Sequence, residues 1–87
     1  MISKIVTISA PNGMHARPAG ELVKLVKSLA PVKLTITGES KTVNAASMLS
    51  ILSLGLKSGS QIVVNADGEG EAEALAKVVS FIEQIAD

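Results

Sequence analysis

Residues 13–19, GMHARPA, contain the side chains of this chain that are best suited to chemistry. His15 is the only histidine in the sequence, and Arg17 lies two positions after it. An imidazole is largely unprotonated near neutral pH, so one of its ring nitrogens can act as a nucleophile. A neighbouring guanidinium stabilises oxyanions through charge-assisted hydrogen bonds. These residue types point to the transfer of a phosphoryl group to His15.

The same stretch lies where a helix is expected to begin. Apolar residues at helical spacing predict a helix over 16–29 that stops before Pro31; they are Ala19, Leu22, Val23, Val26 and Leu29. Residues 14–18 include no Ser, Thr, Asp or Asn that could cap it. We therefore expect the backbone N–H groups of Ala16 and Arg17 to be available to a phosphate. Gly13 permits a turn that would leave His15 exposed.

A structural interpretation of these residues stays open at this point. A single histidine at a helix start is often packed or solvated and takes part in no reaction. Arg17 can likewise be an ordinary surface charge. The residues alone do not decide between these two interpretations.

The composition excludes several classes of function. Without cysteine, the chain has no disulfide, no thiolate nucleophile and no thiolate metal site. No carboxylate is close in sequence to His15, so we expect no metal site and no bound cofactor. Eight basic and eight acidic residues give zero formal net charge, and Phe81 is the only aromatic residue, which argues against nucleic-acid binding.

The chain has no apolar run near the ~18 residues that a membrane-spanning helix needs. Residues 1–13 alternate polar and apolar side chains and lack the apolar block of a signal peptide. We expect a protein that stays in the cytosol and does not insert into a membrane. With 87 residues it is long enough for one domain, 1–87, and too short for two.

Alternating apolar residues predict four strands, and helical spacing predicts two helices besides 16–29. The strands are 2–9, 32–37, 40–44 and 61–66, and the helices are 47–55 and 71–86. Gly38-Glu39 predicts a tight reversal between the second and third strands. Ile5 is expected on the polar face of its strand. The order βαββαβα predicts an α+β fold, an open-faced β-sandwich whose four-stranded antiparallel sheet is covered on one face by three helices.

The helix 47–55 has more apolar residues than one buried face can hold. Ser47 is its expected N-cap and Gly55 its terminator. We expect Ile51 and Leu54 to face the sheet and at least one of Met48, Leu49 and Leu52 to be exposed. An exposed apolar patch of this kind suggests a docking surface, and methionine suits several partners. Core packing is the alternative for each of these three residues. Lys24 and Lys27, on the outer side of the first helix, are further docking candidates, with simple solvation as the alternative.

Two stretches of the sequence resemble the HPr family, the histidine-containing phosphocarrier proteins of the bacterial sugar phosphotransferase system. GMHARPA (13–19) is similar to the family's active-site signature, and KTVNAASMLSILSLGLKSG (41–59) to the signature around its regulatory serine. The resemblance continues through ADGEGEAEAL (66–75), so it covers essentially the whole chain. It implies the same fold, with four antiparallel strands under three helices.

The resemblance also implies roles for individual residues. His15 would accept the phosphoryl group on Nδ1 from phosphorylated enzyme I and pass it to the IIA components of sugar permeases. Arg17 and the N–H groups at 16 and 17 would contact the phosphate. Such a protein is a carrier, and no enzymatic activity of its own is implied. Ser47 aligns with the serine that HPr kinase/phosphorylase modifies in many relatives, which directs them to a catabolite-control transcription factor.

One position departs from the family pattern, because Ala46 stands where relatives commonly carry a basic residue before the serine. Recognition of Ser47 by the kinase is therefore open, and capping is its alternative role. Four functions remain to be distinguished: a sugar phosphocarrier, a carrier in a parallel nitrogen-related relay, a regulatory binding module in which His15 is secondary, and a small α+β interaction domain in which His15 is structural. A monomer is expected, since the site must be open to its partners.

Overall fold

The computed structural model describes residues 1–38 and 41–85. Four strands and three helices follow one another in the order βαββαβα. Their bounds are β1 Ile2–Thr7, α1 Ala16–Ser28, β2 Lys33–Gly38, β3 Lys41–Asn44, α2 Met48–Ser53, β4 Gln61–Asp67 and α3 Glu71–Glu83. The expected order of elements is confirmed.

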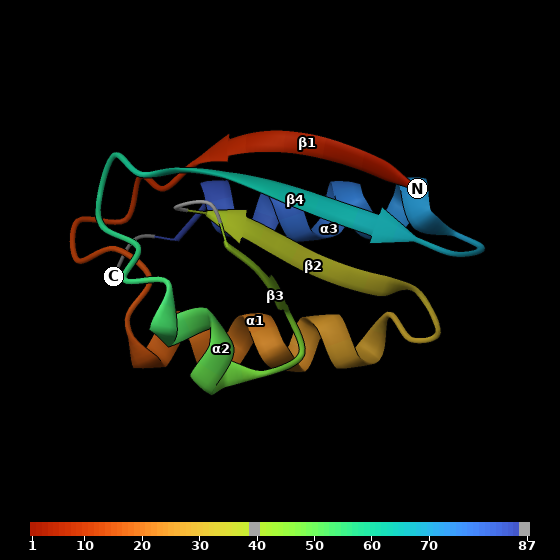
Figure 1. Ribbon diagram of the computed structural model, residues 1–87, viewed down its shortest axis with the longest axis horizontal. Helices are drawn as coiled ribbons and strands as arrows, with labels where there is room; N and C mark the ends of the chain where they lie inside the picture. Colours follow the sequence, from red (N-terminus) through yellow and green to blue (C-terminus); the bar gives the residue numbers. More distant parts are fainter. Residues whose placement is uncertain (39–40, 86–87) are drawn as a thin grey trace.

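The strands form one sheet in the order β1-β4-β2-β3 (Figure 1). All three strand pairs are antiparallel, with Ile5 opposite Val63, Leu34 opposite Ala66 and Thr35 opposite Asn44. β4, the last strand in the chain, thus lies between β1 and β2. The alternation of side chains predicts the antiparallel pairing but not this order, because every strand presents the same kind of apolar face.

The side chains on one face of the sheet form the core. Val6, Leu34, Ile36, Ile62 and Val64 are all buried on this face. Ile5 points to the other face and is 65% exposed, as expected. On that open face, Asn65 accepts a hydrogen bond from Ser3 Oγ at 2.6 Å and donates to Thr35 Oγ1 at 3.1 Å. The network satisfies polar groups that water also reaches.

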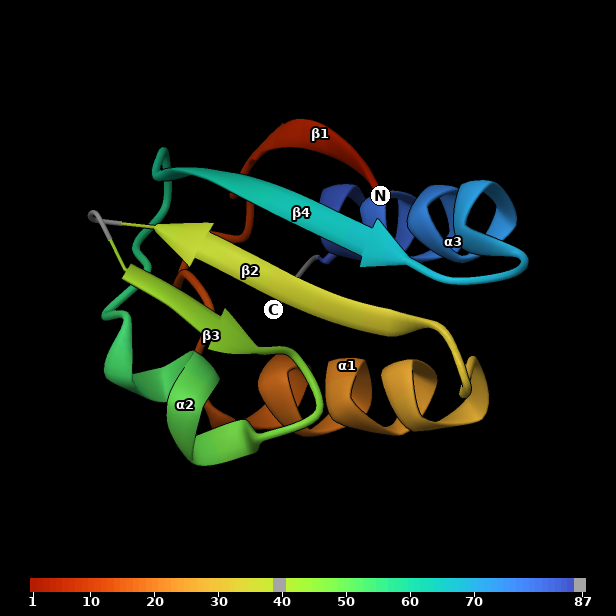
Figure 2. The same cartoon turned by 45° about the vertical axis from the view of Figure 1, so that its right-hand side comes forward.

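Three helices cover the apolar face, and the opposite face carries none of the described helices (Figures 1 and 2). α3 packs against β1 and β4, α1 lies beside α3, and α2 contacts α1 and β3. The predicted open-faced α+β sandwich is therefore confirmed. None of the helices in the described ranges is long and apolar enough to cross a membrane.

Several elements begin or end at other residues than the sequence pattern predicts. β1 ends at Thr7, and Ile8 N donates to Ser60 O at 2.8 Å just beyond the last residue pair, Thr7 opposite Gln61. β2 starts one residue later than expected, since Val32 N donates to Leu29 O at 3.1 Å. α3 ends at Glu83, so the prediction that the helix continues through Gln84 and Ile85 is wrong. The last predicted helical residue, Ala86, lies outside the described residues. The reversal predicted at Gly38-Glu39 also falls partly on an undescribed residue, Glu39.

Candidate functional site

His15 is the N-cap residue of α1. Its backbone is extended, with φ −91° and ψ −173°, and its carbonyl oxygen accepts a hydrogen bond from Ala19 N at 3.0 Å. The His15 side chain makes no capping hydrogen bond, and the first turn has no acidic residue. Neither a capping side chain of His15 nor an acidic residue in the first turn therefore offsets the partial positive charge at the start of the helix, as expected from the sequence. Pro18 lies in the first turn, where its missing N–H costs no helical hydrogen bond.

Buried neighbours on both sides hold His15 in place. Met14 is 4% exposed and its N–H donates to Leu56 O at 3.1 Å. Pro18 and Ala19 are buried on the other side. Gly13 has φ +67°, and a Cβ atom there would collide with Leu56 O and lie 2.8 Å from Lys57 Cα. The turn expected at Gly13 is confirmed, because only glycine fits both this backbone angle and this close approach, but it leaves His15 partly buried and not fully exposed.

The two nitrogens of the His15 ring have different surroundings. Among the described side chains, Nε2 of His15 is the one buried polar atom without a hydrogen-bond partner. The residue as a whole is only partly buried. The ring is therefore enclosed on its Nε2 side, whereas Nδ1 is not among the buried atoms without a partner.

The basic candidates lie along one side of α1. Arg17, Lys24 and Lys27 are all exposed. Positions 17, 20, 24 and 27 follow helical spacing and so share a face of the helix. At Gly20, a Cβ atom would lie 3.8 Å from Met48 Sδ, so α2 borders this face. Gly20 is about 7.5 Å along the axis from His15 at ~1.5 Å per residue, so the contact between α1 and α2 lies within two helical turns of His15.

α2 exposes two of its apolar side chains. Met48 is 37% exposed and Leu49 82%, while Leu52 is partly buried. Ile51 and Leu54 are buried. The distribution expected for this helix is confirmed. Whether these residues bind a partner is a prediction; Met48, Leu49 and Leu52 together with Lys24 and Lys27 are called the docking face below.

Ser47 is the N-cap of α2, as predicted. Its Oγ accepts a hydrogen bond from Ser50 N at 3.3 Å, and the residue is partly exposed. Gly55 follows the helix with φ +60°, the left-handed conformation expected of a helix terminator. Ser47 directly precedes Met48, so a modification at its hydroxyl would border the docking face.

The sequence pattern did not predict that residues 56–59 lie against the segment before His15. Leu56 O binds Met14 N, and next to it Gly59 N donates to Ile8 O at 2.7 Å. These contacts join parts of the chain more than forty positions apart, and no spacing in the sequence indicates them. In the described part of the chain, His, Asp and Glu side chains form no group of three or more that could hold a metal ion.

Comparisons with known proteins cover nearly the whole chain. A family model described as the PTS HPr component phosphorylation site matches residues 2–84. The phosphocarrier protein HPr of Haemophilus influenzae is 38% identical over 82 residues, which are 94% of this chain and 95% of that protein. The crystal structure of a phosphocarrier protein HPr from Bacillus anthracis superposes with a TM-score of 0.88 at 33% identity, over 93% of this chain and 95% of that one. A crystal structure described as an HPr dimer, from Thermoanaerobacter tengcongensis, has a TM-score of 0.73 at 36% identity, over 90% and 91% of the two chains.

Proposed function

Since this chain belongs to the HPr family, the phosphocarriers of the phosphotransferase system, we propose that it carries a phosphoryl group on His15. The group comes from phosphorylated enzyme I and passes to the IIA components of sugar permeases. The observation that carries this proposal is the position of His15, whose half-enclosed ring stands at the uncapped N-terminus of α1.

The enclosure of Nε2 favours Nδ1 as the acceptor atom. The lone pair of Nδ1 attacks phosphorus as the bond between phosphorus and the donor atom of enzyme I breaks, so one N–P bond forms for each bond lost. The proton of the neutral ring stays on Nε2 during this step. Transfer to a IIA component reverses the sequence and returns the neutral imidazole.

The helix N-terminus and Arg17 stabilise the transferred group. A phosphoryl transition state spreads negative charge over its oxygens, and catalysis consists mainly of positioning and electrostatic stabilisation. The first N–H groups of a helix point outward along its axis, so those of Ala16 and Arg17 are proposed to donate to the phosphate oxygens. Arg17, exposed on the first turn, adds a charged donor.

The docking face is proposed to contact the partners. Leu49 and Met48 offer an apolar centre, and the cations of α1 offer attraction to acidic rims. A small surface of this kind suits a carrier that must dissociate quickly from enzyme I and from IIA. A cytoplasmic monomer, with residues 1–87 as one domain, leaves both His15 and the docking face accessible.

Phosphorylation of Ser47 by HPr kinase/phosphorylase is proposed as a second level of control. A phosphate oxygen on Ser47 could accept from Ser50 N as the hydroxyl oxygen does, so α2 would persist. The added charge would change the docking face, reducing transfer and favouring a catabolite-control transcription factor. Incubation with the kinase and ATP tests this, with Ser47→Ala as the control. We expect one phosphoryl group on the wild type and none on the variant. If the wild type is not modified, or if the variant is modified as well, the regulatory proposal fails and the carrier proposal is unaffected.

The carrier function is tested with enzyme I, phosphoenolpyruvate and intact-mass measurement. We expect one added phosphoryl group on the wild type, labile in acid and stable in base, and none on His15→Ala. Ser47→Ala is the matched control and should be modified like the wild type. An unmodified wild type, or a base-labile adduct, would refute the proposal. The two relays are distinguished by the acceptor. Transfer of the phosphoryl group to a sugar-specific IIA component supports the sugar relay, and transfer to the IIA component of a nitrogen-related relay supports the parallel one.

A further inference from the structure

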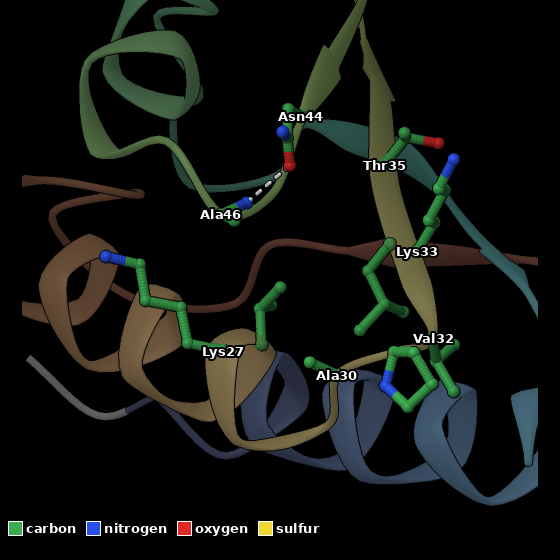
Figure 3. Close-up of a pocket in the computed structure, with 10 residues that line it drawn as sticks. Lys27, Ala30, Val32, Lys33, Thr35, Asn44 and Ala46 are labelled. Carbon is green, nitrogen blue, oxygen red and sulfur yellow. Dashed lines mark hydrogen bonds between the residues drawn. The ribbon is translucent and has the colours of Figure 1, made fainter.

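A second concave site lies at the other end of α1. A cavity of about 530 Å³ opens between the end of α1, the start of β2 and the segment that follows β3 (Figure 3). Binding sites for small molecules have volumes of roughly 300–1,000 Å³. Most of the lining is apolar, and it includes Val26, Ala30, Pro31, Val32, Leu34 and Ala46.

The topology explains why the cavity exists. β3 pairs with β2 only from Thr35 onward, so Lys33 has no partner strand on that side. The chain then turns away at Ala46, whose N–H donates to Asn44 Oδ1 at 2.8 Å. Ala30 and Ala46 face the space from different walls, and both side chains are too small to fill it (Figure 3).

The polar groups around the cavity are mainly hydrogen-bond donors. The aliphatic stems of Lys27 and Lys33 line it from α1 and β2, while their ammonium groups project outward at the rim (Figure 3). The Oδ1 atom of Asn44 is engaged by Ala46, which leaves its Nδ2 amide as a further donor. None of the lining residues is acidic.

Neither lysine is neutralised by a neighbour in the described structure. No ion pair of Lys27 or Lys33 occurs among the residues described. Asp67 lies opposite Lys33 in the β2–β4 register, but its carboxylate is 3.6 Å from the amino group of Met1. The cavity therefore combines an apolar floor with an uncompensated positive rim.

We propose that this cavity binds a small amphipathic anion, a carboxylate or phosphate monoester on a compact aliphatic body. The aliphatic part lies among the apolar residues, and the anionic group lies between the rim lysines and the Asn44 amide. Lys27 is about 18 Å from His15 along α1 at ~1.5 Å per residue, so this site is separate from the phosphoryl site. Lys27 belongs both to this rim and to the docking face, but binding of the anion does not require phosphorylation of His15.

A titration with hexanoate, followed by backbone amide NMR shifts, tests the site. We expect saturable shifts at Ala30, Val32 and Ala46, with a dissociation constant on the order of millimolar, as suits a ligand of few atoms. 1-Hexanol has the aliphatic body without the anionic group, and inorganic phosphate has the anionic group without the aliphatic body. Both should bind more weakly than hexanoate. Equal binding of either probe, or shifts that do not saturate, would overturn the proposal.

Variants locate the binding. Ala46→Leu and Ala30→Leu each narrow the cavity and should weaken hexanoate binding. Ala30 is exposed, so its variant keeps the test valid if Ala46→Leu fails to fold. Lys33→Gln should weaken hexanoate binding roughly 2-fold to 5-fold, as expected of one exposed charge. Lys4→Gln, on β1, is the matched control and should leave it unchanged. Unaltered affinity in folded Ala30→Leu or in Lys33→Gln would overturn the assignment, whatever the outcome at His15.

Discussion

His15 differs from an ordinary exposed histidine in having one ring nitrogen enclosed and the other side of the ring open. Under the proposed function, this asymmetry leaves Nδ1 as the nucleophilic atom that meets the partner. The residue types around it, one imidazole beside one arginine at an uncapped helix, could be recognised in the sequence. The orientation of the ring could not, because it depends on what encloses Nε2 in three dimensions.

Arg17→Gln should slow phosphoryl transfer from enzyme I without unfolding the protein. A charge-assisted hydrogen bond to the transferred group would be lost, and the expected loss in rate is roughly 10-fold to 100-fold. Arg17 is exposed, so thermal unfolding should change little. Rapid-quench measurements of the phosphorylated fraction give the rate, with Lys4→Gln as the control. A rate within twofold of the wild type would exclude Arg17 from the phosphate cradle.

Gly13→Ala should destabilise the fold more than Gly55→Ala. Both glycines have positive φ, +67° and +60°, but a Cβ atom meets Leu56 O and Lys57 Cα at Gly13 and nothing within 4 Å at Gly55. Backbone strain alone costs about 1–2 kcal/mol, which we expect at Gly55, whereas at Gly13 the collision adds to it. Urea unfolding gives both free energies. Equal losses would mean that the His15 loop is not clamped against residues 56–57.

At the scale of the elements, the proposed function assigns phosphoryl transfer to the start of α1 and partner contact to the surface that α1 shares with α2. α1 carries His15 at its start and basic residues along one side, and α2 adds exposed apolar residues where Met48 reaches Gly20. Helical spacing predicted both helices and the caps at Ser47 and Gly55. Spacing alone could not show that the two helices touch, since that contact is set by how each packs on the sheet.

Ser47→Ala should lower the stability of the protein by about 1 kcal/mol, because the Ser50 N–H loses its acceptor. Ser47→Asp keeps an oxygen at the cap and should be nearly as stable as the wild type. Thermal unfolding of the three proteins checks this. A Ser47→Ala variant as stable as the wild type would show that the 3.3 Å hydrogen bond contributes nothing.

Leu49→Gln should weaken the complex with enzyme I, whereas Ile5→Gln should not. Both side chains are exposed, at 82% and 65%, but Leu49 lies on α2 beside α1 and Ile5 on the open face of the sheet. Loss of a central apolar contact costs about 1–2 kcal/mol of binding, or roughly 5-fold to 30-fold in affinity. Isothermal titration measures both variants. Equal losses, or a loss for Ile5→Gln alone, would move the docking face off α2.

For the molecule as a whole, the sequence predicted the layers but not every neighbour. The alternation at Val6, Leu34 and Ile62 identified the buried face, and the order of elements identified the open-faced sandwich. The insertion of β4 between β1 and β2 was not predictable from alternation, which is alike in all the strands. The cavity beside Lys33 was also hidden, because it arises where β3 ends before β2 does.

The most direct test of the account is the position of phosphorus on the histidine ring. The ¹⁵N-histidine-labelled protein, phosphorylated by enzyme I and phosphoenolpyruvate, can be measured by ¹⁵N and ³¹P NMR under basic conditions that preserve the adduct. We predict phosphorus bonded to Nδ1 of His15, the nitrogen on the open side of the ring. Phosphorus on Nε2, or on a hydroxyl group, would contradict the account.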